Sequence, residues 1–196
     1  MPLWGNTDAD ESKPKWLTTA QKKEVYANAE GWVVEAGSTM TGNDNTNADP
    51  EILVAIGGLA TNIGAADVTE VEWITTAADK SAGFTLSVRV RYNEAVTVTG
   101  SPTLAVTNGN QGSGSGRGPH TLVYASGSGS NELVFSLAIA AGNAATNEDD
   151  QLTIGAQNIA KPGGATIKDT AGTASDSAVA ISAGQGTAAG TITVVA

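Results

Sequence analysis

The sequence contains no cysteine and a single histidine, and these two absences exclude much catalytic and metal chemistry. Without cysteine the chain has neither a disulfide framework nor a thiolate ligand, so the fold must be held together by its core alone. Because His120 is the sole imidazole, most histidine metal sites and most histidine acid–base designs are excluded. We therefore expect no enzyme, no catalytic residues and no cofactor.

Positive charge is scarce as well. Lysine and arginine number 10 against 20 acidic residues, giving a formal net charge of −10 and a pI near 4.4. Phosphate backbones and anionic membrane surfaces repel such a chain, so we expect no nucleic-acid and no membrane partner. No apolar run approaches the roughly 20 residues that span a bilayer, and the N-terminus lacks the basic-then-apolar layout of a secretory signal. If the protein leaves a cell, we expect host lysis as the route.

Aromatic residues make up 5% of the chain and charged residues 15%, whereas hydrophobic residues reach 40%. This balance is typical of a globular protein and not of a highly charged disordered polymer. The abundant small side chains suit extended strands, tight turns and closely packed surfaces. At 196 residues the chain is long enough for one β-sandwich and an extra segment.

The clearest pattern is in residues 84–92, where apolar and polar side chains alternate with a period of two. A one-residue slip in the pairing of this strand would bury two arginines, so the inward face is fixed. A turn is predicted at residues 93–95. Further strands are predicted at residues 96–99, 103–107, 121–124 and 133–139. Several short strands separated by turn signals predict an all-β sandwich.

The N-terminal part gives weaker signals. Thr18 and Gln21 have capping-box spacing, which predicts a short helix opening at Ala20. Residues 24–27 and 32–35 predict a β-hairpin, with a helix through the connecting segment as the alternative.

Other strand candidates flank the central pattern. Residues 52–56 are continuously apolar, which indicates a strand buried on both faces or lying at a subunit contact. Residues 68–74 predict a strand that leads into the sandwich. C-terminal strands are predicted at residues 151–154, 165–168, 178–181 and 191–195. The last of these pairs either within the chain or with a neighbour's open edge.

Several blocks between residues 84 and 180 resemble a bacterial immunoglobulin-like repeat found in large surface and adhesion proteins. The blocks are residues 92–104, 124–129, 131–135, 141–143 and 166–172. The resemblance implies an immunoglobulin-like β-sandwich and no enzymatic activity, because that family serves as a spacer and binding module. The sequence departs from the family in having one copy and a longer, glycine-rich connection at residues 108–119.

The first 75 residues are similar to the N-termini of virion structural proteins from tailed phages of marine cyanobacteria. Residues 1–8, 12–16, 31–37 and 52–58 carry this similarity. Together the two resemblances imply a protein of the particle surface. An N-terminal region would bind the particle and carry an immunoglobulin-like domain outward.

We therefore predict an N-terminal arm and β-rich attachment region at residues 1–78 and an immunoglobulin-like sandwich at residues 79–196. Trp4, Trp16 and Trp32 are the predicted partner-binding residues, since tryptophan anchors large apolar areas beside polar groups. The arm docks either on its own domain or on another subunit. The expected partners are the major capsid protein or other virion proteins, copies of the chain itself, and host-surface glycans.

The favoured function is a capsid decoration protein. The alternatives are a neck, tail or fibre-associated virion protein, and a bacterial adhesin-like module that binds carbohydrate. No metal site is expected from the sequence, although Asp149, Asp150 and Asp169 leave calcium binding open. A solvated acidic turn at residues 148–150 is the preferred interpretation.

Three further groups are considered as candidate sites. Arg89 and Arg91 either pair with an acidic neighbour or, as we favour, serve solubility and edge protection. Glu70 and Glu72 share a strand face, but the sequence indicates no substrate cleft beside them. His120 is predicted to be a polar loop residue. The glycine-rich residues 112–118 lack the ending of a phosphate loop, so a hairpin tip is expected.

Overall fold

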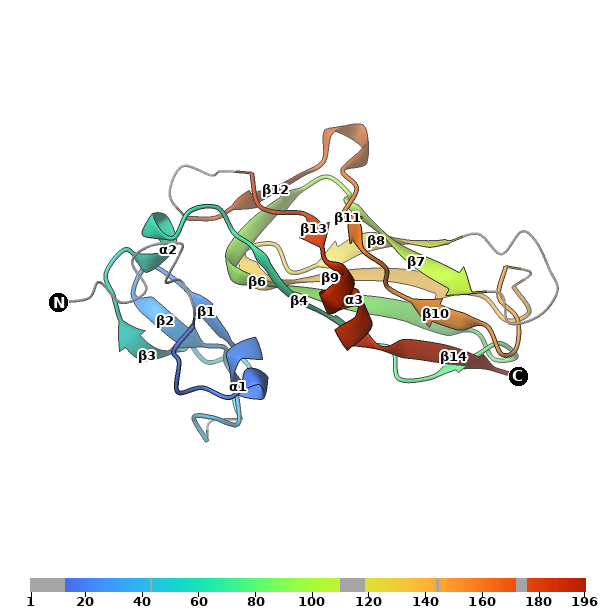
Figure 1. The fold of residues 1–196 in the computed structure, drawn as a ribbon, viewed down its shortest axis with the longest axis horizontal. Coiled ribbons are helices and arrows are strands. Elements are labelled where there is room, and N and C mark those ends of the chain that lie inside the picture. The colour runs from blue at the N-terminus through green and yellow to red at the C-terminus, as the bar shows by residue number, and fades with distance from the viewer. Residues whose placement is uncertain (1–12, 43, 110–118, 144, 172–175) are drawn as a thin grey trace.

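The computed structural model describes residues 13–42, 44–109, 119–143, 145–171 and 176–196, and within them the protein is mostly β-structure (Figure 1). The described strands form a 12-stranded mixed sheet and a separate two-stranded sheet. Along the large sheet the main strand order is β3-β2-β1-β6-β9-β8-β7-β10-β14-β5, while β4 and β12 each pair with β6. The prediction of a β-rich chain is confirmed at this level.

Residues 13–63, the N-terminal unit, hold a small β-structure with two short helices. Its elements are α1 (Thr19–Lys23), β1 (Val25–Ala27), β2 (Gly31–Val34), β3 (Glu51–Ala55) and α2 (Leu59–Asn62). The predicted capping box is present, because Thr18 and Gln21 each bind the other's backbone N–H. The predicted hairpin is confirmed by the antiparallel pairing of β1 with β2, and the alternative helix is wrong.

Gly31 opens strand β2 at a place where only glycine fits. Its φ is +143°, and a Cβ there would lie 2.0 Å from the carbonyl oxygen of Val54 on β3. The close approach of β3 therefore depends on the missing side chain.

Of the two alternatives for residues 52–56, burial on both faces is wrong, and a subunit contact stays a prediction. Strand β3 lies at the end of the strand order and pairs with β2 alone among the described strands. Ile52 is consequently 50% exposed. A continuous apolar run does not distinguish an edge strand from a central one, because both lie extended.

A smaller core fills the N-terminal unit beneath the hairpin. Its buried residues are Leu17, Val25, Ala27, Trp32, Val34, Leu59, Ala60 and Ile63. Trp32 is the bulkiest of them and is fully buried. Burial of its ring stabilises the N-terminal unit, and Ala171 of the following part of the chain packs against the same cluster.

Residues 66–196 form the larger unit. Its strands are β4 (Val68–Trp73), β5 (Ala78–Asp79), β6 (Phe84–Thr99), β7 (Thr103–Gly109), β8 (His120–Ser126), β9 (Ser130–Ile139), β10 (Gln151–Thr153), β11 (Gln157–Asn158), β12 (Thr166–Asp169), β13 (Ala180–Ile181) and β14 (Thr191–Val195). A 3₁₀ turn, Pro162–Gly164, precedes β12. A larger core lies within this unit and contains buried residues from Ala66 to Val194.

Strand β6 is the longest described strand and carries the predicted inward face. Leu86, Val88, Val90 and Tyr92 are fully buried, as their alternation predicts. The predicted turn at residues 93–95 is wrong, because β6 continues through it with a register shift against β9 between Arg91 and Val96. Such a bulge bends a strand without ending it, and β12 pairs with the continuation.

The C-terminal strand pairs within the chain. Strand β14 lies antiparallel to β10 and parallel to β5, which settles the alternative that the sequence left open. Helix α3 (Ala183–Ala189) precedes β14 and was not predicted. Ser182 and Gln185 form a capping box at its start, so the sequence did contain a signal for it.

The large sheet is continuous rather than divided. Strand β7 pairs with β8 through residues 103–106 and with β10 through residues 107–109. The described strands therefore form one open mixed sheet, in which β7 joins two groups of strands. The N-terminal unit joins the same sheet where β1 runs parallel to β6 at Ala27 and Glu94.

Candidate functional site

A groove lies where the N-terminal unit meets the larger unit. It has a cavity volume of about 530 Å³ and is bordered by α1 on one side and by β4 and α3 on the other. Its charged lining residues are Lys13, Lys22, Lys23, Asp67 and Glu70. The remaining lining residues are Thr19, Thr69, Asn93, Gln185 and Ala188. Junctions between units are a common place for ligand sites.

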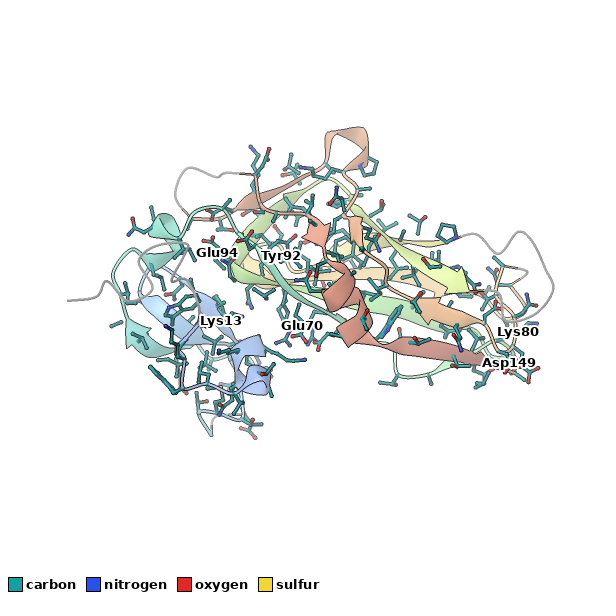
Figure 2. The ribbon with its side chains drawn as sticks, in the orientation of Figure 1. Lys13, Glu70, Lys80, Tyr92, Glu94 and Asp149 are labelled. Atoms are coloured by element: carbon teal, nitrogen blue, oxygen red, sulfur yellow. The ribbon has the colours of Figure 1, made fainter. Side chains whose placement is uncertain are left out.

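Lys13 is the buried positive charge of this groove. Lys13 is only 9% exposed, and its Nζ donates a hydrogen bond of 2.7 Å to the carbonyl oxygen of Lys22. Burial, with a smaller contribution from the nearby Arg91 charge, lowers the pKa of Lys13 to about 8. Figure 2 shows Lys13 on the N-terminal unit and Glu70 on β4 of the larger unit. Across the junction, Glu70 forms an ion pair with Lys23.

Arg91 is the second buried cation at the junction. Its Nη1 donates to the carbonyl oxygen of Lys23 at 2.6 Å, so a side chain of β6 holds the end of α1. Three carboxylates surround its guanidinium at 2.8 to 3.6 Å, namely those of Glu132, Glu72 and Glu35. Because its side chain is only 7% exposed, Arg91 acts as a structural link between the two units.

The favoured interpretation of the two arginines, solubility and edge protection, is therefore wrong. Arg89 also pairs with Glu72, at 2.9 Å, although its side chain is 31% exposed. The alternation of β6 placed both arginines on the face opposite the larger core. Alternation could not show that β4 pairs beside β6 and brings Glu72 to this face, or that Lys23 and Glu35 of the N-terminal unit meet it there.

Glu94 and Asp169 form a buried acidic pair beside the junction. Glu94 is fully buried, and neither of its carboxyl oxygens has a hydrogen-bond partner of regular geometry among the described residues. Burial, and to a smaller extent the adjacent Asp169 carboxyl, raises the pKa of Glu94 to about 8. Burial also raises the pKa of Asp169. The pair is therefore stabilised when Glu94 is protonated.

The three predicted partner-binding tryptophans have different positions. Trp4 lies outside the described residues. Trp16 is 66% exposed on the N-terminal unit. Trp32 is fully buried in the smaller core, so its ring packs the unit and does not reach a surface.

The acidic residues considered for calcium lie at two places. Asp150 is fully buried, and its carboxylate accepts from the backbone N–H of Asn147 at 2.7 Å. Asp169 contacts Glu94 instead, and Figure 2 places Glu94 next to the N-terminal unit and Asp149 at the far end of the larger unit. Within the part of the chain that the structure describes, no three acidic or histidine side chains group as metal ligands.

His120 is not the polar loop residue that was predicted. It begins β8 and is 6% exposed, and its Nε2 lies 3.2 Å from the Thr146 hydroxyl and 3.4 Å from the Asn108 amide. Burial lowers its pKa. The glycine-rich residues 112–118 lie outside the described residues, so the predicted hairpin tip remains a prediction.

Two of the residues that define the junction escaped the sequence analysis. Lys13 stands in an irregular segment, and nothing in its neighbours signals burial. Glu94, by contrast, lies two residues after Tyr92 on β6, and alternation places both side chains on the inward face. The burial of Glu94 would have been predicted if the strand had been extended through residues 93–95.

The chain was compared with models of protein families, with curated proteins and with solved structures, and none of the three comparisons found a match. Among the described helices, none is long and apolar enough to cross a membrane. The chemical properties of the site must therefore be taken from its own residues. The groove offers positive charge and hydrogen-bond donors.

Proposed function

We propose that this protein is a non-enzymatic structural component of a phage virion that decorates the capsid surface. In this proposal the N-terminal region attaches the chain to the major capsid protein or to other virion proteins. The larger unit is an immunoglobulin-like β-sandwich displayed outward, where host-surface glycans are within its reach. The resemblances of the two halves of the sequence support this division of roles.

The path of β7 supports the sandwich. A strand that pairs with one group of strands through its first half and another through its second half can carry a sheet around a corner. The larger core, which draws residues from both groups, would then be enclosed between the two halves of one sheet. Antiparallel pairing prevails through β4, β6, β9, β8 and β7, as such sandwiches require.

One observation supports attachment through the N-terminal unit above the rest. This unit has its own core, yet its Trp16 is 66% exposed, the highest value among the large apolar residues described, and its Ile52 is 50% exposed, close to the 52% of Val195 on the larger unit. Ile52 lies on the edge strand β3, whose outer backbone groups are available for a further strand. An exposed apolar side chain on an open strand edge is typical of a surface that binds another protein.

If many copies attach to one particle, the interface of each copy can have a low affinity. On a regular lattice, neighbouring copies add avidity, so a modest interface per copy is sufficient. Contacts between copies of the chain itself would strengthen the layer further. Arg91 matters here because it keeps the attached unit and the displayed unit in one arrangement.

Quantitative mass spectrometry of purified particles tests the proposal. A copy number of the same order as that of the major capsid protein is the expected result. Far fewer copies would favour the neck, tail or fibre-associated alternative. Absence from particles, together with binding of the isolated chain to host cells, would instead favour the adhesin-like alternative and overturn the virion proposal.

A further inference from the structure

Several hydrogen-bond donors of the groove at the junction have no partner among the described residues. The Lys13 ammonium has three N–H groups, and one of them is used by the carbonyl oxygen of Lys22. The side chains of Lys22 and Thr19 and the Asn93 amide N–H₂ have no hydrogen-bond partner among the described residues. All four groups can donate, and two of them are positively charged.

Most acceptors of the groove, in contrast, are already engaged. The Asn93 side-chain oxygen accepts from the backbone N–H of Asp67 at 2.7 Å, and that of Gln185 accepts from Ser182 at 2.8 Å. Glu70 Oε1 is paired with Lys23, and Asp67 has its own interaction. The exception is Glu70 Oε2, which is buried and has no hydrogen-bond partner among the described residues. The groove is therefore matched to a ligand that accepts hydrogen bonds.

Lys13, which lines this groove, has no ion-pair partner among the described residues. Burial and the Arg91 charge outweigh the effect of the Glu70 and Glu35 charges on its pKa. No carboxylate of the described residues lies within ion-pair distance of Lys13 Nζ, although the residue is only 9% exposed. Burying an ammonium without a paired charge is costly, and a bound anion would offset that cost. Charge-assisted hydrogen bonds to an oxyanion would also use the remaining N–H groups.

The lining further indicates what kind of molecule bears the anion. Apart from Ala188, every described lining residue is polar or charged, so the apolar surface of the groove comes mainly from the carbon atoms of these side chains, such as the lysine stems. The Thr19 hydroxyl and the Asn93 amide suit the hydroxyl and ring oxygens of a sugar. A volume of about 530 Å³ lies within the range of small-ligand sites.

We propose that this groove binds an acidic saccharide, with a carboxylate or sulfate group held by Lys13 and Lys22. The inference rests on the proposed function in one respect: the proposed function says that the glycan belongs to the host surface. It adds the site and the ligand class. Binding is measured on the isolated chain, so absence of the protein from particles and failure to bind the saccharide are separate results.

Titration of the isotope-labelled full chain with trigalacturonate, followed by NMR, tests the inference. The expected result is saturable shifts at the backbone N–H groups of Thr19, Lys22 and Asn93. The fully methyl-esterified trisaccharide, which keeps the sugar and loses the charge, should bind at least about tenfold more weakly, as expected for a lost charge-assisted bond. Sodium sulfate and a short poly-aspartate peptide complete the set of probes.

Variants show whether the groove is the site. Lys13→Gln should weaken trigalacturonate binding by about tenfold or more, and Lys22→Gln by several-fold. Lys15→Gln removes the same charge from an exposed position outside the groove and should change the affinity by less than about twofold. If Lys13→Gln fails to fold, Lys22→Gln still tests the site.

The inference is overturned if the methyl ester binds as well as the acid, or if Lys22→Gln and any folded Lys13→Gln bind like the unmodified protein. It is equally overturned if sulfate alone or poly-aspartate binds as tightly as the trisaccharide, because the sugar would then contribute nothing.

Discussion

Arg91 Nη1 donates a hydrogen bond of 2.6 Å to the carbonyl oxygen of Lys23, which joins the longest strand of the larger unit to the last turn of helix α1. The same guanidinium meets three carboxylates. Its side chain is 7% exposed, so these interactions are little screened by water. This contact fixes the junction on which the groove and the attachment proposal both depend.

Replacing Arg91 by Met should lower the free energy of unfolding by about 3 to 5 kcal/mol, because three partly buried carboxylates would lose their counter-charge and the Lys23 carbonyl its hydrogen bond. Denaturant unfolding monitored by tryptophan fluorescence and by circular dichroism measures this loss. Arg89→Met is the matched control, since Arg89 pairs with Glu72 and Glu132 but is 31% exposed. We expect it to cost under about 1 kcal/mol. Equal losses in the two variants would contradict the role given to Arg91.

Raising the pH should destabilise the protein through Glu94. The pKa of this carboxyl is raised from 4.5 to about 8 in the folded chain. Its stabilising contribution is therefore fully present below pH 4.5 and is lost as the pH rises through about 8. We expect a loss on the order of 2 kcal/mol between pH 5 and pH 8, reduced from the full shift because the two acids titrate together.

Glu94→Gln isolates this effect, because an amide resembles the protonated acid. The free energy of unfolding of the variant, relative to that of the unmodified protein, should increase as the pH rises. Other groups cancel in that difference, including Glu35, whose pKa burial raises to about 7, and His120, whose pKa burial lowers. Glu51→Gln, on an exposed part of β3, is the control. Parallel pH profiles for the variant and the unmodified protein would refute the role of Glu94.

Two glycines of helix α3 should respond oppositely to alanine. A Cβ at Gly186 would lie 2.1 Å from the carbonyl oxygen of Ile154, whereas at Gly184 the nearest atom is the Ser182 hydroxyl at 3.9 Å. Gly184→Ala should therefore stabilise the protein by about 0.5 to 1 kcal/mol through helix propensity. Gly186→Ala should destabilise it by roughly 1 to 3 kcal/mol because the helix must move. Thermal melting measures both, and a stabilising Gly186→Ala would show that α3 does not pack as described.

The exposed Trp16 should matter for attachment and little for folding. Trp16→Ala should leave the melting temperature nearly unchanged, since 66% of the residue is exposed, but should weaken binding to particles that lack the protein. Val123→Ala changes an exposed apolar residue of the larger unit, 42% exposed, and should leave binding intact. Co-sedimentation with particles compares the two variants. Undiminished binding of Trp16→Ala would remove this residue from the proposed interface.

The sequence predicted local structure better than the way its parts meet. The inward face of β6 and the hairpin of β1 and β2 follow from alternation and turn residues, which are local. The exposed edge of β3 and the burial of Arg91 depend on contacts between distant segments. The sequence pattern of β3 or of β6 alone does not predict those contacts.

The candidate site shows the same limit. Helix α3, which borders the groove, had a readable capping signal at Ser182 and Gln185. Lys13 had none, because its burial comes from the way α1 packs against the larger unit. Tryptophan content alone also did not separate the core role of Trp32 from the surface position of Trp16.

Electron cryomicroscopy of the assembled particle tests the central claim most directly, since it shows which part of the chain touches the capsid. The account predicts the N-terminal unit, with Trp16 and strand β3, against the capsid shell and the larger unit pointing outward. Contact through the larger unit, with Trp16 facing solvent, would contradict it.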